Sequence, residues 1–564
     1  MAIPRILIRF AHEYISCKIG GLLSETRKKF VNFVSKKSFL KGWYGFIVFF
    51  FALFVIIPTV FVISYIFTDW SAVSSVLSDP GKVSIIISAV IFSFEIATIV
   101  TIIDFIMGLP LAWMLVRKKF RGKKFLNTLI DIPLVVPTGA AGFSIALFWA
   151  ITPGVSALGS LRLISSPFLL IMLLHIVFSY PYMVRSLAAI LEEIDVTYDI
   201  AAQTCSASPL TAARTITLPL FKAGLITGTI LCFARSLSET GGTMIALSMI
   251  GTSIKTGPVL VGVWKKESLT NPQLVPALAF VSILLIVLAI ILLIIVKLVI
   301  MKVKLPFRKV WPGPEKFLSR GITPHLKDFL SLIFLIIVIL IPTFFVFGFV
   351  ATPHPGVDMV WSTFFGSLGY SFLVGGVVTA IDLLLGIPMA ILITRGKSKR
   401  LGHVLDALVN VPLIVPTAAL GFSLGMFWNR SGINVPLVLI ILAHVAFTYP
   451  LVVRCVAGAI EEIDPSFEET AHTLGAKPLQ VFRRVLFPMI KSSVLAGSII
   501  ALARSLGETG ATLAVSPTTV TAPVYIVNLI NNKAYYQTAL ACIVLIIVSF
   551  IFLLLLRYTT RKER

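Results

Sequence analysis

Charged residues are scarce in this chain. They make up 13% of its 564 residues, against roughly 25% in soluble domains, whereas apolar residues make up 57%. So apolar a composition excludes an ordinary soluble protein and an intrinsically disordered chain. The sequence therefore predicts an integral membrane protein.

Cysteine clusters and nucleotide-binding motifs are absent as well. The five cysteines show no CxxC or other spacing typical of metal ligands, and no carboxylate–histidine cluster suggests a metal site. No GxxxxGK[ST] phosphate-binding loop occurs in the sequence, so the chain is not expected to hydrolyse ATP by that route. We therefore predict no catalytic residue, no metal site and no cofactor bound by this chain.

Basic residues outnumber acidic ones and recur in every second loop. The formal net charge is +23, and an excess of this sign often indicates a nucleic-acid-binding protein. The basic residues are spread along the chain, however, at 5–41, 117–124, 297–327, 395–400 and 561–564. Basic loops stay in the cytoplasm, so we predict a multi-pass cell-membrane protein with both termini cytoplasmic, lipid around it and no nucleic-acid partner. The loop with Lys255, Lys265 and Lys266 departs from this pattern.

Apolar runs long enough to cross a bilayer recur twelve times. A helix needs about 20 apolar residues to span the hydrocarbon layer. We therefore predict an all-α polytopic membrane protein with twelve transmembrane helices. The expected spans are 43–67, 91–116, 126–151, 168–191, 223–250, 274–301, 329–350, 369–393, 404–428, 436–460, 492–515 and 539–556.

The two halves of the chain are copies of one another. Residues 104–110 match 382–388, and further along the chain equivalent residues lie 269 positions apart, as Tyr180 and Tyr449 do. Because each copy holds six spans, both have the same orientation, and the repeat is parallel, with its axis along the membrane normal. The predicted domains are a basic cytoplasmic segment (1–42), a first six-helix domain (43–301), a cytoplasmic linker (302–328), a second six-helix domain (329–556) and a basic cytoplasmic tail (557–564).

The longest amphipathic loop of each half lies between its fourth and fifth spans. In the second half, Asp464 followed by Pro465 is a helix-start signal. Gly475 can end that helix in a left-handed conformation, and Pro478 suits the first turn of another helix. The sequence thus predicts two short helices joined at a sharp glycine turn on the cytoplasmic face.

This loop resembles the EAA motif of importer permeases of the ATP-binding-cassette (ABC) superfamily, whose pattern is EAA, three residues, G, nine residues and I-x-L-P. The second half has Glu469, Ala471, Gly475 and Pro488 at the corresponding positions. The plainer alternative is a solvated connector, but a connector does not explain why the pattern recurs in both halves.

The first half carries a decayed copy of the motif, with Ala201, Ala202, Ser206 and Pro219 at the corresponding positions. Serine stands there in place of the glycine. Because serine adopts a positive φ less readily than glycine, the first loop is expected to turn less sharply than the second.

The resemblance covers nearly the whole chain beyond residue 40 and implies the fold of a type I ABC importer. In that family the loop is a coupling helix that docks on the ATPase subunit. The resemblance therefore implies a homodimer of ATPase subunits on the cytoplasmic side, which would hold ATP and Mg²⁺. It also implies a separate solute-binding protein outside the cell membrane.

Two arginine–glutamate pairs are predicted at membrane depth, where ionisable groups are costly. Arg235 precedes Glu239 by four residues, and Arg504 precedes Glu508 by four, so each pair can share a helix face and neutralise itself. The pairs either face the pathway near a gate or lock adjacent helices together. Further pathway candidates are two threonines and two prolines of the broken third spans: Thr240, Thr509, Pro137 and Pro416.

The stretch Glu508-Thr-Gly-Ala-Thr512 is similar to an E-x-G-A-T sequence in permeases for sulfate, molybdate and tungstate. This similarity implies import of an inorganic oxyanion, with phosphate or phosphonate as second choices. An anion pathway would use helix N-termini, basic groups and hydroxyls, such as those of Ser236, Thr243 and Ser505. Fused double permeases of ferric-iron or thiamine importers are an alternative, and a twelve-helix secondary transporter is the alternative from another class.

Overall fold

The computed structural model describes residues 32–150, 164–220, 222–302, 312–319, 323–351 and 359–561, and every regular element within these ranges is a helix. Helix α16 carries apolar side chains around its whole circumference, as a membrane span does. The longest helices are α6 (Pro80–Arg117), α9 (Pro167–Glu193), α16 (Val275–Lys302), α20 (Trp361–Arg395), α24 (Pro436–Glu461), α27 (Phe487–Leu506) and α30 (Tyr535–Arg561).

The first span of each half is a composite helix that passes through a π-helical turn. A proline follows each turn, Pro58 in the first half and Pro342 in the second, and it lacks the N–H that a regular helix would use. The elements are α2 (Lys37–Phe50), η1 (Phe51–Ile56) and α3 (Ile57–Val60), and in the second half α18 (Thr323–Phe334), η5 (Leu335–Leu340) and α19 (Ile341–Val350).

Shorter helices form the broken spans, the loops and the two ends of the molecule. In the first half they are α4 (Tyr65–Thr68), α5 (Trp70–Leu77), α7 (Lys123–Val135), α8 (Thr138–Trp149), α10 (Val196–Thr204), α11 (Pro209–Ala212), α13 (Lys222–Leu237), α14 (Gly241–Ile250) and α15 (Gly257–Glu267). Helix α17 (Pro312–Leu318) lies in the linker. In the second half they are α21 (Lys399–Val409), α22 (Val411–Ile414), α23 (Thr417–Arg430), α25 (Ser466–Thr473), α26 (Pro478–Val481), α28 (Gly510–Val515) and α29 (Ala522–Asn531).

Nine helices in the described ranges are long and apolar enough to cross a membrane, and eleven spans result if each of two bent helix pairs counts as one. The bent pairs are the third spans, which turn by 101° at Pro137 and by 106° at Pro416. The predicted proline breaks are therefore present. The total of twelve stays a prediction, because the first-half equivalent of the span Pro478–Leu506 runs over residue 221, outside the described ranges.

The predicted fifth spans, 223–250 and 492–515, are wrong in their extent. Helix α13 ends at Leu237 and α14 starts at Gly241, and in the second half α27 and α28 are likewise separate. The cause is a glutamate between the helices, because Glu239 accepts the backbone N–H of Gly242 at 2.9 Å. This carboxylate caps the new helix, and Glu508 makes the equivalent contact in the second half.

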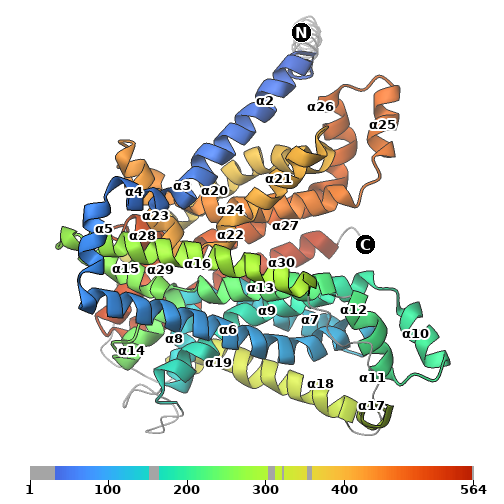
Figure 1. Cartoon of the computed structure of the whole chain (residues 1–564), viewed down its shortest axis with the longest axis horizontal. Helices are drawn as coiled ribbons and strands as arrows, with labels where there is room; N and C mark the ends of the chain where they lie inside the picture. Colours follow the sequence, from blue (N-terminus) through green and yellow to red (C-terminus); the bar gives the residue numbers. More distant parts are fainter. Residues whose placement is uncertain are drawn as a thin grey trace, which may run out of the picture.

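The two sequence halves exchange their first spans. Helices α2 and α3 pack on α20 and α23 of the second half, whereas α18 and α19 pack on α6 and α8 of the first half (Figure 1). Aromatic rings join these surfaces: the ring centroids of Phe51 and Tyr449 lie 5.6 Å apart, and those of Tyr180 and Phe334 lie 5.5 Å apart. Each packed half of the molecule therefore contains a span from the other half of the sequence.

A buried serine fixes each exchanged span. Ser423 donates to the carbonyl of Pro58 at 2.7 Å and accepts the N–H of Val62 at 2.8 Å. Ser144 makes the same two bonds to Pro342 and Val346, at 2.7 and 2.9 Å. The hydroxyls thus satisfy backbone groups that the irregular helices leave without internal partners.

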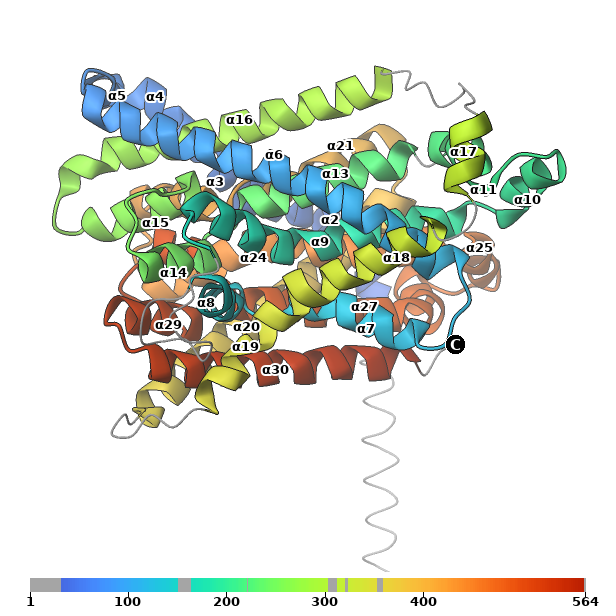
Figure 2. The same ribbon diagram turned by 90° about the horizontal axis from the view of Figure 1, so that it is seen from below.

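The molecule has two distinct ends. Helices α10, α11, α17 and α25 lie at one end, and α4, α5, α14, α15 and α29 lie at the opposite end (Figure 2). The long helices run between them. The described part of the chain therefore presents its EAA-like loops at one end and its short connecting helices at the other.

Candidate functional site

The second EAA-like loop, residues 464–488, contains the short helix α25 and then α26, which continues through a π-helical turn into α27. Asp464 accepts the backbone N–H of Ser466 at 2.9 Å, and this bond holds the pKa of the Asp464 carboxyl below its usual range. Gly475 then adopts a left-handed φ of +82°, and Pro478 starts the next helix. The predicted glycine turn between two helices is present, although α25 begins at Ser466 rather than at Pro465. The second helix is not short as predicted, because it runs without a break from Pro478 to Leu506.

The first EAA-like loop, residues 195–219, turns in the same way. Ser206 has a φ of +68°, so the expectation of a weaker turn is wrong. Two backbone bonds close the turn: the N–H of Ser206 donates to Gln203 at 3.0 Å, and that of Ala207 donates to Ala202 at 3.1 Å. The second loop has equivalent bonds at Gly475 and at the residue after it. The hydrogen bonds of this helix ending outweigh the steric cost at a serine.

The motif residues lie on the outside of the two loops. Ala201, Ser206, Glu469, Gly475 and Pro488 are exposed, and Ala202, Pro219 and Ala471 are half-buried. Large apolar side chains are exposed beside them, with Leu474 at 83% of its full exposure. Phe467 is exposed on the same loop, and Val196, Tyr198 and Ile200 are exposed on the first loop. Such surface marks a protein–protein contact more often than a solvated connector.

A half-buried arginine ties each EAA-like loop to the end of the second span. Arg395 at the end of α20 pairs with Glu468 at 2.9 Å and donates to the carbonyl of Ile463 at 2.6 Å. Arg117 at the end of α6 pairs with Asp199 at 3.7 Å and donates to the carbonyl of Ile194 at 2.9 Å. No local motif predicts these pairs, although the 269-residue offset relates Asp199 to Glu468.

The segments that precede the first spans also touch the loops. Glu315 of α17 pairs with Arg214 at 2.6 Å and accepts the hydroxyl of Thr211 at 2.5 Å, both beyond the turn of the first loop. On the second loop, Lys477 donates to Asn32, which precedes α2. These contacts cross between the sequence halves in the same sense as the exchanged spans.

Both predicted arginine–glutamate pairs are formed. The guanidinium of Arg235 lies 2.8 Å from Glu239, and that of Arg504 lies 2.6 Å from Glu508. Each pair joins the last turn of one helix to the start of the next, so it does not share one helix face as predicted. The glutamates are nearly inaccessible, with side-chain exposures of 2% and 3%, whereas Arg504 keeps 20%.

Two buried histidines form hydrogen bonds with hydroxyls that were expected to line an anion pathway. His175 lies 2.9 Å from both Ser236 and Thr243, one at each ring nitrogen. His444 contacts Ser505 and Thr512 in the same way, at 2.7 and 2.9 Å. These hydroxyls therefore hold α9 and α24 against the broken fifth spans, and that expectation is corrected.

The four helix breaks meet at a place that we call the central junction. It consists of Pro137, Thr138, Pro416, Thr417, Ser238–Gly241 and 507–510. A β-carbon added to Gly241 would lie 2.6 Å from the hydroxyl of Thr509, and one added to Gly510 would lie 2.7 Å from the hydroxyl of Thr240. The two halves thus touch through glycine–threonine contacts that leave no room for a larger side chain. The predicted pathway residues converge here from separate parts of the chain.

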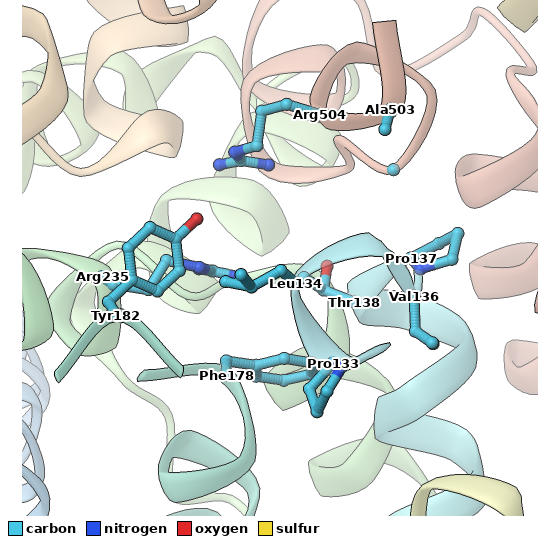
Figure 3. Close-up of a pocket in the computed structure, with 11 residues that line it drawn as sticks. Pro133, Leu134, Val136, Pro137, Thr138, Phe178, Tyr182, Arg235, Ala503 and Arg504 are labelled. Atoms are coloured by element: carbon cyan, nitrogen blue, oxygen red, sulfur yellow. The ribbon is translucent and has the colours of Figure 1, made fainter. Parts of the chain in front are cut away.

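A pocket opens beside the central junction and is lined by both halves (Figure 3). Pro133, Pro137 and Thr138 come from the first broken span, and Arg235 and Arg504 approach the same space from opposite sides. Each guanidinium lies over an aromatic ring, Arg235 at 5.3 Å from the Phe178 centroid and Arg504 at 5.1 Å from that of Phe447. The pocket therefore presents two guanidinium groups whose glutamate partners lie outside its lining.

Comparison with known proteins adds a family match. A family model described as "binding-protein-dependent transport system inner membrane component" matches the chain twice, at residues 104–305 and 382–562. The chain is 30% identical over 209 residues to the probable transport system permease protein NifC of Clostridium pasteurianum, covering 34% of this chain and 73% of NifC.

Two further relatives are named for oxyanions. The chain is 35% identical over 170 residues to the probable sulfate transport system permease protein cysT of Marchantia polymorpha, covering 29% of this chain and 58% of cysT. It is 32% identical over 197 residues to the molybdenum transport system permease protein ModB of Escherichia coli K12, covering 32% of this chain and 79% of ModB. Each of these matches covers about a third of the chain.

Proposed function

Because this chain belongs to the family of binding-protein-dependent transport system inner membrane components, we propose that it is the membrane permease of an ATP-driven ABC importer. One polypeptide would supply both permease halves. The observation that carries the proposal is the pair of EAA-like loops, which share one backbone geometry and expose apolar side chains at the same end of the molecule. Two equivalent loops suit two equivalent clefts on an ATPase homodimer, which would hold ATP and Mg²⁺.

The end that carries the loops would face the cytoplasm. Arg117 at the end of α6 and Arg395 at the end of α20 contact the loops there, and the basic runs 117–124 and 395–400 begin at these residues. Basic loops are retained on the cytoplasmic side. Both termini would then be cytoplasmic, and a separate solute-binding protein would deliver the substrate to the opposite end.

The substrate would be an inorganic tetrahedral oxyanion such as sulfate, molybdate or tungstate. Arg235 and Arg504 line one pocket between the halves, and a guanidinium binds such anions with two parallel N–H donors. Two relatives are named for sulfate and molybdenum. Phosphate and phosphonate share this chemistry and are the second choices, whereas ferric iron, as a cation, suits a pair of guanidinium groups poorly.

The hydrogen-bonded contacts provide a route from the loops to the central junction. Helix α24 leads into the second loop, and its Arg454 pairs with Asp406 of α21 at 2.6 Å. Arg185 of α9 pairs with Asp131 of α7 in the same way. Because α7 ends at the break at Pro137, and α21 leads through the short helix α22 to the break at Pro416, a movement of the loops would reach the junction through these pairs. ATP-driven closure of the ATPase would then open or close the contacts of Gly241 with Thr509 and of Gly510 with Thr240.

Uptake by a reconstituted transporter tests this proposal. The chain would be placed in proteoliposomes with the ATPase and the solute-binding protein that copurify with it, and uptake of radiolabelled sulfate, molybdate and tungstate would be measured. We expect uptake that needs ATP and the binding protein. Uptake of ferric iron or thiamine in place of these anions would overturn the substrate class. Uptake driven by an ion gradient without the ATPase would indicate a secondary transporter instead.

A further inference from the structure

The two copies of the repeat differ at Lys265, where the first half has a basic residue and the second has an apolar one. Helix α15 of the first half and α29 of the second are equivalent, because the backbone N–H of Gly257 donates to Ser93 at 2.7 Å and that of Ala522 donates to Ser371 at 2.8 Å. These contacts set the offset at 265 residues. Lys265 therefore corresponds to Ile530, an isoleucine with only 4% exposure. The first half thus carries a cation where the second has a core residue.

Lys265 lies close to the central junction, on the side away from the EAA-like loops. Gly262, one helical turn earlier, would bring a β-carbon to 4.0 Å from the methyl group of Thr240. Helix α15 also packs on α23 and α28 of the second half. In Figure 1 it lies at the end opposite α10 and α25. An anion that arrives from that end would pass α15 before it reaches the junction.

The ammonium of Lys265 is half-buried and lacks a carboxylate partner among the described residues. Its nitrogen lies 5.8 Å from the ring centroid of Phe422, which is itself buried. An aromatic face satisfies one side of the ammonium and leaves N–H donors for an acceptor. Two other cations at this end do have carboxylate partners, Arg430 with Asp69 at 2.7 Å and Lys82 with Asp79 at 3.3 Å. Lys265 is therefore placed to receive an anion from outside the protein.

We propose that Lys265 is the cation of an oxyanion-binding site on the outer side of the central junction, and this rests on the proposed function. The site would hold a tetrahedral oxyanion between its release outside and the opening of the junction. Because Phe422 belongs to the other half of the sequence and is buried, the site lies at the contact between halves rather than on a lipid-facing surface. The ligand would thus be a free anion and not a lipid phosphate.

Local amine modification of the wild-type chain tests the site directly. The full chain would be placed in phosphatidylcholine nanodiscs and treated with an acetylating reagent, with the modified lysines located by mass spectrometry. We expect sulfate and tungstate to slow modification of Lys265 several-fold, and to leave modification of the exposed Lys266 and the half-buried Lys255 unchanged. Equal modification of Lys265 with and without these anions would overturn the proposal. Protection by added phosphatidylglycerol but not by sulfate would show a lipid-headgroup site, which would also overturn it.

A matched set of variants gives the second measurement, which also decides the matter if the reagent fails to reach Lys265. Lys265→Met should raise the sulfate concentration for half-maximal uptake by about tenfold, the loss expected for one charge-assisted hydrogen bond. Lys265→Arg should retain most of the affinity, and Lys266→Met should behave as wild type. If Lys265→Met changes only the melting temperature, the lysine is structural and the proposal fails.

The two proposals can fail separately. Sulfate uptake that is normal in Lys265→Met would leave the permease function standing and remove the outer site. Protection of Lys265 by sulfate without any ATP-dependent uptake would leave the outer site standing and remove the proposed function.

Discussion

At the scale of single residues, the duplicated arginine–glutamate pairs combine two tasks. Glu508 pairs with Arg504 and also accepts the N–H of Ala511 at the start of α28. Arg504 pairs with Glu508 and also lines the pocket between the halves. The glutamate therefore caps the helix that follows the break, whereas the arginine both neutralises the glutamate and lines the pocket. A substitution can separate helix capping from anion binding only if the residue at position 508 still accepts the N–H of Ala511.

The double variant Arg504→Met with Glu508→Gln separates them. Glu508→Gln alone leaves Arg504 without its counter-charge, which typically costs about 3–5 kcal/mol for a buried pair. The double variant removes both charges, and the glutamine oxygen can still accept the N–H of Ala511. We expect its melting temperature in detergent to return close to that of the wild type while oxyanion uptake stays lost. Arg430→Met with Asp69→Asn, a pair remote from the pocket, is the matched control and should transport normally. Full uptake by the Arg504 and Glu508 variant would leave that pair as a purely structural lock.

At the scale of elements, the two EAA-like loops depend on one left-handed residue each. A β-carbon at Gly475 would meet no atom within 4 Å, so the effect of a substitution there comes from the backbone alone. A valine at a φ of +82° costs about 1–2 kcal/mol or more, because its branched β-carbon excludes the left-handed region. We expect Gly475→Val to insert normally but to lose ATPase binding and uptake. Gly475→Asn, whose side chain tolerates this conformation, should retain both, and normal uptake by Gly475→Val would refute the coupling role.

In the first loop, the informative substitution at the equivalent position is the reverse one, from serine to glycine. Ser206 already holds a φ of +68°, so glycine there relieves a steric cost but loses more chain entropy on folding. Ser206→Gly should therefore raise the free energy of unfolding by no more than about 1 kcal/mol and leave uptake intact. A thermal melt beside an ATPase pull-down would measure both. A marked loss of ATPase binding would show that the serine hydroxyl itself contacts the partner.

At the scale of the whole molecule, the exchange of first spans makes the two sequence halves depend on each other. Ser144→Ala and Ser423→Ala would each leave a buried carbonyl and a buried N–H without a partner. We expect each to lower stability by about 1–3 kcal/mol, and by similar amounts, because the contacts are duplicated. Thermal melts of the detergent-extracted chain would measure this. Ser498→Ala, which removes a bond within one helix, should have little effect, and a comparable loss there would remove the link between these serines and the exchange.

The orientation of the molecule in the membrane is open to direct labelling. In a background without native cysteines, cysteines placed at Ser74 and Thr518 should react with a membrane-impermeant reagent in intact cells. A cysteine placed at Ser398 should react only after permeabilisation. The native Cys205 is exposed in the first loop and, restored alone, should behave like Ser398. Reaction of the Ser398 position in intact cells would overturn the proposed topology.

The sequence by itself determined the features that depend on local chemistry. Pro137 and Pro416 break the third spans because proline lacks an N–H and restricts the residue before it. Asp464 and Gly475 mark the start and end of α25 because capping needs only residues within one turn. The repeat identified equivalent residues in advance, including the arginine–glutamate pairs. Composition alone indicated a membrane protein, because so high an apolar fraction leaves apolar side chains on the outside of the molecule however its helices pack.

Tertiary structure decided everything that joins distant residues. The hydroxyls of Ser236 and Thr243 turn to His175, more than 60 residues away, and no local pattern shows which way a hydroxyl points. Ser206 is left-handed although its side chain disfavours that region, because the loop closes with the same backbone bonds as its glycine counterpart. The exchange of first spans, with Ser423 bonded to a carbonyl 365 residues away, follows from the burial of whole helix faces, which only the packed molecule decides.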